Sequence, residues 1–162
     1  MTDSLWSLST SELFRMYRGV LRELTDRGIV RTMNAPAGDY AEYLVAALTK
    51  GELADNSEKS WDIRTPEGER LQVKCRVVQE GKRGQRQLSP FRTWDFDRAV
   101  ILLFDEDYGI QRCVALPRAV VEEHATYREH VNGHVMRATD VVMDHDSGED
   151  WTDDLRRVSA DL

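Results

Sequence analysis

The segment Glu69–Val78 constrains the fold more than any other part of the chain. Apolar residues fill every second position, and polar residues lie between them. This period of two predicts a β-strand, because successive side chains of a strand point to opposite sides of the sheet. The apolar face is Leu71, Val73, Cys75 and Val77, and the other face is Arg70, Gln72, Lys74 and Arg76. The strand therefore predicts a sheet with one packed side and one side that carries an amide and three cations.

The residues before this strand predict a hairpin. Pro66–Gly68 has the composition of a tight turn, and Ser60–Thr65 reads as a strand that contains Asp62. A hairpin of these two strands would bring the Asp62 carboxylate beside Gln72 and Lys74.

The rest of the chain alternates helical and strand patterns. Helices are predicted from Ser9 or Thr10 to Gly28, at Asp39–Thr49, at Pro117–His124 and at Asp153–Val158. Further strands are predicted at Glu52–Ala54, at Arg98–Phe104 in the centre of the sheet, and at Ile110–Leu116, while Val131–Met143 fits a strand or a turn. This order predicts one α/β or α+β domain over residues 1–162, with a mixed sheet flanked by helices. Within it we expect a helical extension at 1–35, a motif-bearing core at 38–125 and an acidic tail at 138–162.

Charge is distributed unevenly along the chain. The net charge is −7, which by itself argues against tight nonspecific binding of nucleic acid. The segment Arg70–Arg92 nevertheless carries seven basic residues and one acid, so it is +6 and the remainder is −13. A local concentration of cations can attract phosphate despite an acidic total. We therefore expect a basic rim beside the strand, with five candidate nucleic-acid contacts: Arg64, Arg76, Lys82, Arg83 and Arg86.

The polar face of the strand suits one kind of chemistry. Asp62 offers a carboxylate, Gln72 an amide oxygen and Val73 a backbone carbonyl, and oxygen ligands of this kind hold Mg²⁺. Lys74 can stabilise negative charge that develops on a phosphate or help to deprotonate a water. Glu42, on the predicted helix Asp39–Thr49, would add a second carboxylate. These residues form a candidate catalytic set for metal-dependent hydrolysis of a phosphodiester, with Mg²⁺ or Mn²⁺ held by Asp62, Gln72, Val73 and Glu42.

The spacing of these residues resembles the restriction-endonuclease-like superfamily, the PD-(D/E)xK nucleases. Three stretches carry the resemblance within about a quarter of the chain, and they look like one small bacterial branch: Gly38-Asp-Tyr-Ala-Glu42, Asn56-Ser57-x-Lys59-x-x-Asp62-Ile63-Arg64 and Gln72-Val73-Lys74. The resemblance implies a mixed sheet in which a helix supplies one acid, a hairpin the metal-binding Asp, and the next strand an acid and a Lys. Glu42, Asp62, Gln72 and Lys74 match these positions. Trp61 stands at the Pro position of the motif, where members of the family often lack the Pro, and Gln72 stands at the position of the acid, a change that some branches tolerate.

Two functions follow as hypotheses. The first is a Mg²⁺-dependent DNA endonuclease of restriction or phage-defence type, and the second is a catalytically weak or inactive nuclease-fold protein that binds DNA or serves as an adaptor subunit. The target sequence and the choice between DNA and RNA stay open. A homodimer is expected if both strands are cut, because a twofold axis supplies two sites; a subunit of a larger complex is the other expectation. No signal segment or membrane span is apparent, so we expect a cytoplasmic protein that does not bind membranes.

Other patterns leave alternatives. The apolar stripe of the first helix, from Leu13 to Leu24, fits either a core or a dimer face. Phe91, Trp94 and Phe96 fit either core residues or an aromatic patch that stacks on bases. His130 and His134 are four residues apart, but no third ligand accompanies them, so they are interpreted as ordinary histidines. Cys75 and Cys113 are interpreted as buried thiols.

Overall fold

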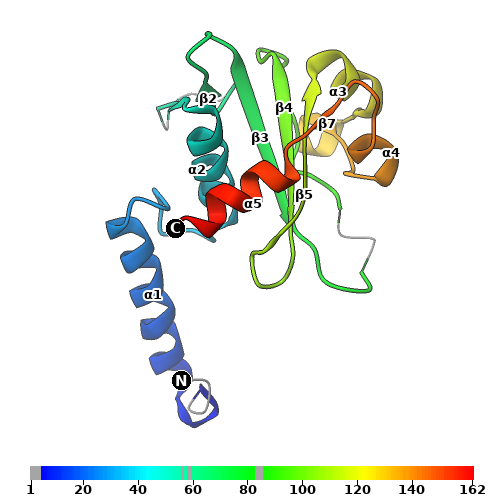
Figure 1. Cartoon of the computed structure of the whole chain (residues 1–162). Helices are drawn as coiled ribbons and strands as arrows, with labels where there is room; N and C mark the ends of the chain where they lie inside the picture. Colours follow the sequence, from blue (N-terminus) through cyan, green and yellow to red (C-terminus); the bar gives the residue numbers. More distant parts are fainter. Residues whose placement is uncertain (1–4, 56, 58–59, 83–85) are drawn as a thin grey trace.

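A mixed six-stranded sheet forms the centre of the computed structural model, which describes residues 5–55, 57, 60–82 and 86–162. The strand order is β1-β2-β3-β4-β5-β8 (Figure 1). The strands are β1 Glu52–Leu53, β2 Ile63–Arg64, β3 Arg70–Val77, β4 Arg98–Phe104, β5 Ile110–Pro117 and β8 Glu149–Asp150. β3 and β4 run parallel, and every other neighbouring pair is antiparallel. The predicted α+β architecture with a mixed sheet is thereby confirmed.

Strand β4 is buried on both faces. Its residues from Ala99 to Phe104 are all fully buried. Ala99, Ile101 and Leu103 join one apolar cluster, whereas the three residues between them join the other. An apolar strand of this kind needs a layer on each side of the sheet, because each face would otherwise expose apolar surface to water.

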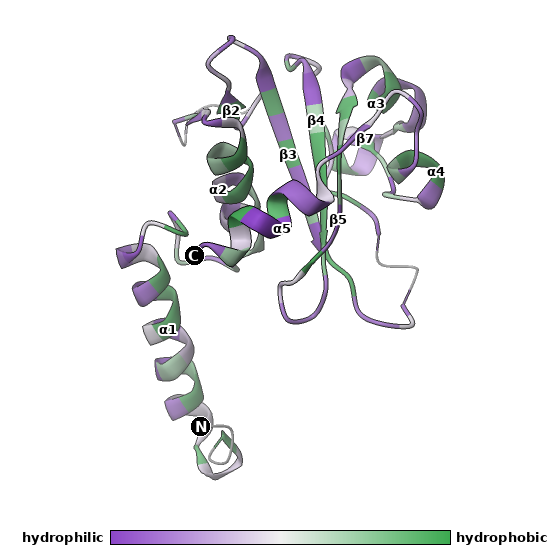
Figure 2. Cartoon of the chain, in the orientation of Figure 1, coloured by the Kyte–Doolittle hydropathy of each residue, from purple (hydrophilic) through white to green (hydrophobic). Residues whose placement is uncertain are grey.

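Helices supply these two layers (Figures 1 and 2). One face is covered by α2 (Ala37–Thr49) and α5 (Thr152–Ala160), through residues such as Leu44 and Leu155. The other face is covered by α3 (Arg118–His124), α4 (Asp140–Met143) and the loop that contains Phe91 and Phe96. A small hairpin, β6 (Thr126–Arg128) with β7 (Gly133–Val135), lies beside this second layer. The 3₁₀ turns are η1 (Leu5–Ser7) and η3 (Glu129–Val131).

The aromatic residues after β3 belong to the core. Phe91 and Phe96 are fully buried, and Trp94 packs against both with its ring centroid 6.1 Å from each. Of the two interpretations of this region, the structure therefore favours core residues over a stacking surface for bases. Cys113 is buried and Cys75 is half-buried, and both are free thiols.

The hairpin forms with a shorter first strand than predicted. Gly68 adopts a left-handed φ of 88°, which a residue without a Cβ takes most readily, and its N–H donates to Thr65 in the turn. β2, however, comprises only Ile63 and Arg64, so the prediction of a strand throughout 60–65 is wrong. Asp62 lies immediately before β2. Its N–H still donates to the carbonyl of Leu71 (2.8 Å), which keeps it beside β3.

The C-terminal segment is part of the fold. Residues 138–162, the acidic tail of the sequence, form α4, an edge strand and α5, and α5 contains the helix predicted at Asp153–Val158. Trp151 and Leu155 are buried against the sheet, and the Thr152 hydroxyl accepts the N–H of Cys113 (2.9 Å). The acidic side chains therefore lie on the outer face of an amphipathic segment whose apolar side is packed.

The first helix, α1 (Thr10–Asp26), begins where predicted but does not join the core. Ser9 caps it, and Ser9 and Glu12 exchange hydrogen bonds in a capping box. Leu21 is the buried residue of this helix. Figure 1 shows that α1 projects away from the sheet. Among the described residues, the helices are all too short or too polar to cross a membrane.

A core truncation in β4 tests this architecture. Leu102→Ala removes a fully buried side chain and leaves a cavity between the sheet and α2, which we expect to lower the free energy of unfolding by about 2–5 kcal/mol. Val141→Ala is the matched control, since Val141 is an exposed residue of α4 and its truncation should change stability by about 0.5 kcal/mol or less. Urea denaturation measures both. Equal stabilities of the two variants would contradict the assignment of β4 as the central strand.

Candidate active site

The Asp62 carboxylate is held at the edge of β3. Its Oδ2 accepts the N–H of Val73 (2.6 Å) and the side-chain N–H of Gln72 (2.8 Å). Because β2 is so short, none of the described strands pairs with β3 on this side beyond Leu71. Asp62 takes the place of a strand there and satisfies a backbone donor that would otherwise lie open.

The carbonyl of Val73 faces the same edge. In a strand, the N–H and C=O of one residue point to the same side, and neighbouring residues point to opposite sides. The Val73 N–H points to Asp62, so its carbonyl oxygen also points to the side of β3 away from β4. One carboxylate and one carbonyl oxygen thus share a small region of the sheet edge.

The Lys74 side chain reaches the same region but is bound to the loop that follows. Its Nζ donates to the hydroxyl of Ser89 and to the carbonyl of Pro90, both at 3.0 Å, and lies 5.0 Å from the ring centre of Phe91. Burial lowers the pKa of Lys74, and the negative charge of Asp62 partly offsets this effect. The ammonium is therefore a buried cation whose proton is held less firmly than that of a surface lysine.

Glu42 reaches the site from α2. Its side chain is 19% exposed, and its Oε2 accepts from the Arg31 guanidinium at 2.9 Å. Arg31 also donates to the carbonyl of Ala54 (3.0 Å), and its own N–H donates to Asp39 (2.9 Å). The arginine thus links the α1–α2 connection, α2 and the residue after β1. Sequence reasoning missed Arg31, because it lies in an irregular segment whose course the local pattern does not specify.

The two carboxylates influence each other's protonation. The pKa of Glu42 is raised to about 7, first by burial and then by the charge of Asp62, although Arg31 acts in the opposite direction. Burial also raises the pKa of Asp62, against the hydrogen bond from Val73 and the charge of Lys74. Together these raised pKa values mean that the nearby cations, Arg31 and Lys74, do not fully offset the cost of burying the two carboxylates in their charged form.

These donors fit a hard divalent cation. Two carboxylates and a carbonyl are oxygen ligands of the kind that Mg²⁺ and Mn²⁺ prefer, and a bound cation would relieve the excess negative charge between Glu42 and Asp62. The Gln72 side chain now donates its N–H to Asp62. Its amide would have to rotate for the carbonyl oxygen to join Asp62 as a ligand.

The predicted nucleic-acid contacts do not lie together in one rim. Arg64 is exposed and lies over the Trp61 ring at 5.2 Å, and Arg76 and Lys82 are exposed. Arg86 instead pairs with Asp140 of α4 (2.7 Å) and is only 22% exposed. Arg83 lies outside the described residues, as do Asn56 and Lys59 of the motif.

A second group of ligand-type side chains was not predicted. Ligand atoms of Glu123, His124 and His145 lie within 4.8 Å of one another, between α3 and the end of α4. Their imidazoles suit zinc more than magnesium. The Nδ1 of His145, however, already accepts the N–H of Ser147 (3.1 Å), which competes with coordination at that atom. His130 and His134, which the sequence spaces like ligands, fall in η3 and β7 and share no helix face.

Titration of Glu42 gives a stability test. Because its folded-state pKa of about 7 exceeds the ordinary 4.5, the folded protein keeps a proton that the unfolded chain releases between these pH values. This contribution to stability is complete below pH 4.5 and is lost as the pH rises through 7. Between about pH 5 and pH 8 the free energy of unfolding of the wild type should fall by on the order of 2–3 kcal/mol more than that of Glu42→Gln. The glutamine side chain has the shape of glutamate but does not titrate. Urea denaturation in the presence of a chelator measures the difference, and parallel pH profiles would contradict it.

Similarity to known proteins does not identify a function for this site. No protein-family model matches the sequence, and no curated protein matches it. The cluster of Glu42, Asp62, Gln72 and Lys74 is therefore the basis on which a function is proposed.

Proposed function

We propose that this chain is a divalent-metal-dependent DNA endonuclease with a restriction-endonuclease-like fold. The observation that carries the proposal is the convergence of Glu42, Asp62 and Lys74, which come from α2, the entry to β2, and β3. Their charges act on one another's protonation. Residues up to 32 positions apart in the sequence are thus near enough for their charges to interact beside β3, which supports the proposal.

The arrangement of elements supports the same proposal. A helix that bears one acid packs on a sheet whose hairpin bears the second, and the next strand runs parallel to a buried central strand. This is the arrangement that the resemblance to PD-(D/E)xK nucleases implies. The observed mixed sheet agrees with this arrangement, and on this basis we propose the restriction-endonuclease-like fold.

Each residue has a distinct role in this proposal. Asp62, Glu42 and the Val73 carbonyl hold Mg²⁺ or Mn²⁺, and a rotated Gln72 amide supplies a neutral ligand. When bound, the ion neutralises charge on the scissile phosphate and lowers the pKa of a nucleophilic water. Lys74 exchanges its hydrogen bond with Ser89 for one with the phosphate or the water, and its lowered pKa favours proton transfer at Nζ.

DNA is the proposed substrate, and defence against foreign DNA in a bacterial cytoplasm is the proposed setting. Arg64, Arg76 and Lys82 are exposed cations near either end of the strand that carries the site, so they are the proposed backbone contacts. Arg86 is a weaker candidate because Asp140 already neutralises it.

Cleavage of plasmid DNA tests the proposal. With Mg²⁺ or Mn²⁺ the wild type should nick or linearise the plasmid, and Asp62→Asn or Lys74→Met should each lower the rate by about 100-fold or more. The exposed residues Asp146 and Lys50 provide matched controls, because Asp146→Asn and Lys50→Met remove the same charges away from the site. A wild-type activity that survives both site substitutions would overturn the site assignment.

Gln72, the neutral side chain among the proposed metal ligands, gives a second test. In Gln72→Glu a third carboxylate joins Asp62 and Glu42, so we expect the affinity for Mn²⁺ in calorimetry to rise by about tenfold. Without metal the same variant should unfold at a lower temperature than the wild type, because like charges crowd and the hydrogen bond to Asp62 is lost. Gln111→Glu, at an exposed position of β5, should change neither quantity. Unchanged metal affinity in Gln72→Glu would place the ion elsewhere.

A nuclease-fold subunit that does not cut is the second candidate. It is favoured by the internal pairing of the site, in which Asp62 is satisfied by Gln72 and Val73, and Glu42 by Arg31. Calorimetry distinguishes the two functions. Divalent binding that disappears in Asp62→Asn and in Glu42→Gln would count against the non-cutting subunit.

A further inference from the structure

The apolar face of α1 is exposed from Leu13 to Val20, and the apolar residues of the preceding turn η1 are exposed as well. Figure 2 shows this face as a stripe on the projecting helix. Trp6 is 90% exposed and Phe14 is 69% exposed, and five more large apolar residues are between 39% and 54% exposed: Leu5, Leu13, Met16, Tyr17 and Val20. A soluble helix with such a face normally packs it against another surface. In the described part of the chain, nothing covers these residues.

The size of this face matches a protein interface. A fully exposed aromatic side chain offers about 150–250 Å², and values of this order weighted by the exposed fractions above give roughly 800 Å² for the seven residues of η1 and α1. A standard-size interface buries about 800 Å² on each partner, whereas an exposed apolar patch on a monomer seldom exceeds about 600 Å². The face is therefore too large to be ordinary scattered surface.

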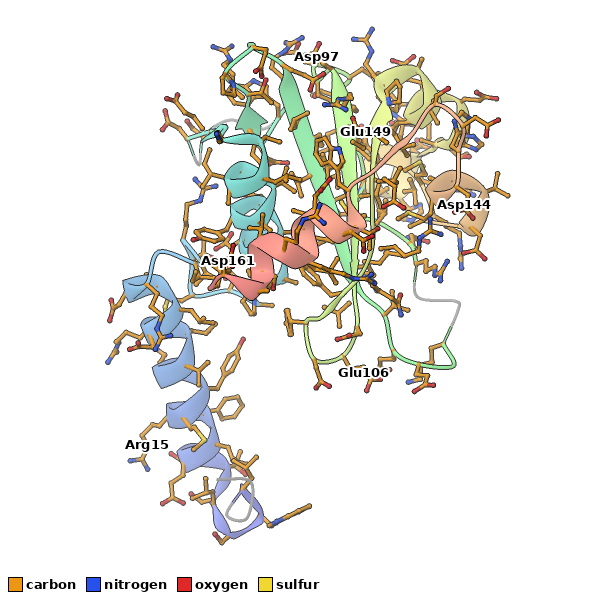
Figure 3. All side chains as sticks on the ribbon, in the orientation of Figure 1. Arg15, Asp97, Glu106, Asp144, Glu149 and Asp161 are labelled. Atoms are coloured by element: carbon orange, nitrogen blue, oxygen red, sulfur yellow. The ribbon has the colours of Figure 1, made fainter. Side chains whose placement is uncertain are left out.

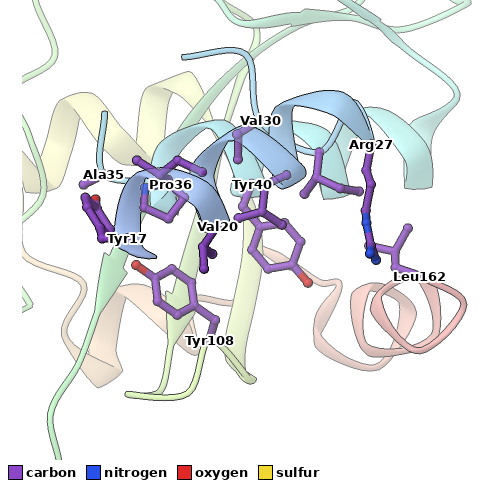
Figure 4. Close-up of a pocket in the computed structure, with 12 residues that line it drawn as sticks. Tyr17, Val20, Arg27, Val30, Ala35, Pro36, Tyr40, Tyr108 and Leu162 are labelled. Carbon is purple, nitrogen blue, oxygen red and sulfur yellow. The ribbon is translucent and has the colours of Figure 1, made fainter. Parts of the chain in front are cut away.

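An apolar groove lies where the same helix meets the domain. Its volume is about 590 Å³, and Figure 4 shows the residues of α1 and of the domain that line it. Val30, Tyr40, Tyr108 and Leu162 line its domain side, and Val20 lines its helix side. A groove of this size accepts one or two large apolar side chains. A single chain thus carries both a projecting apolar arm and an apolar groove at its base.

The charges beside these two surfaces are opposite. The outer part of the arm, residues 10–22, carries Arg15, Arg18 and Arg22 against the acid Glu12, whereas the base of α1 adds the acids Glu23 and Asp26. Arg27 lines the groove itself, and acids flank two of its lining residues in the sequence: Asp105, Glu106 and Asp107 precede Tyr108 in the β4–β5 turn, and Asp161 precedes Leu162. Figure 3 shows Arg15 on the arm and Glu106 and Asp161 on the domain. An anionic membrane would be repelled by this acidic border and by the net charge of −7.

We propose that a second copy of this chain docks on this surface, with the α1 arm of each copy lying against the groove and the α1 face of the other. Such an exchange is isologous: each copy gives an arm and receives one, and the twofold axis closes the assembly at a dimer. The arginines of one arm then lie beside the acidic border of the other copy. This inference does not depend on nuclease activity, and its test uses no DNA.

Sedimentation velocity and light scattering on the full chain, from roughly 1 to 100 µM, test the proposal. The wild type is expected to be a dimer whose dissociation constant increases with salt concentration. Phe14→Glu should raise the dissociation constant by about 100-fold, and Phe14→Ala should raise it by about tenfold or more. Circular dichroism verifies that each variant keeps its fold. Val141→Glu is the control, since this residue is 70% exposed on the distant α4 and its substitution should leave the dimer intact.

A charge exchange tests the orientation of the two copies. Arg18→Glu should weaken the dimer, and the additional change Glu106→Arg in the same chain should restore part of the loss. A wild type that is monomeric at 100 µM, or a dimer that Phe14→Glu does not weaken, would overturn the proposal. So would association of open-ended size, or a monomer that sediments with phosphatidylserine vesicles through Phe14.

Discussion

The structure depends on the burial of one strand on both of its faces. Every residue of β4 from Ala99 to Phe104 is inaccessible to water, and alternate residues belong to different apolar clusters. This constraint requires a layer of helices on each side of the sheet. It also places β3 beside a fully buried strand that pairs with it along its length, so β3 has a firmly packed support. The candidate site is built on that support, and rigid elements position such groups more accurately than loops do.

The candidate site owes its openness to a strand that stops early. If β2 extended back through Asp62 to Trp61, the backbone of Trp61 would pair with Val73 in this register and close the edge of β3. Because β2 comprises two residues, the carboxylate of Asp62 makes that hydrogen bond instead, and the carbonyl of Val73 shares the edge with it. Glu42 approaches the same place from α2. The shortness of β2 is thus what allows two carboxylates and a carbonyl to lie together.

The site is balanced between internal pairing and ligand binding. Arg31 pairs with Glu42, Gln72 donates to Asp62, and Lys74 donates to Ser89 and Pro90. These contacts keep the buried charges tolerable in the absence of other partners, yet both carboxylates retain raised pKa values. A neutral residue at position 72 limits the negative charge of the site. It makes the apo state easier to fold, and it also removes one anionic ligand that would strengthen metal binding.

The sequence by itself determined the local elements and the strand that carries the candidate residues. The alternation of β3, the apolar run of β4, the Ser9 cap of α1 and the turn at Gly68 all follow from preferences that act within a few residues. These preferences also foretold that Asp62, Gln72 and Lys74 would share a hairpin. They could not foretell that β2 would begin only at Ile63, that Arg31 would pair with Glu42, or that Arg86 would pair with Asp140. Each of these features depends on residues distant in the sequence.

Only the tertiary structure decided which apolar faces are covered. The stripes of α1 and α5 look alike in the sequence, since both are amphipathic helices with charged outer positions. α5 packs on the sheet because β8 and Trp151 anchor it beside β5, whereas α1 is joined to the domain through a connection that carries it past the edge. Periodicity records that a face is apolar, but packing between distant segments determines what lies against it. For this reason the acidic C-terminal segment became part of the core and the N-terminal helix remained exposed.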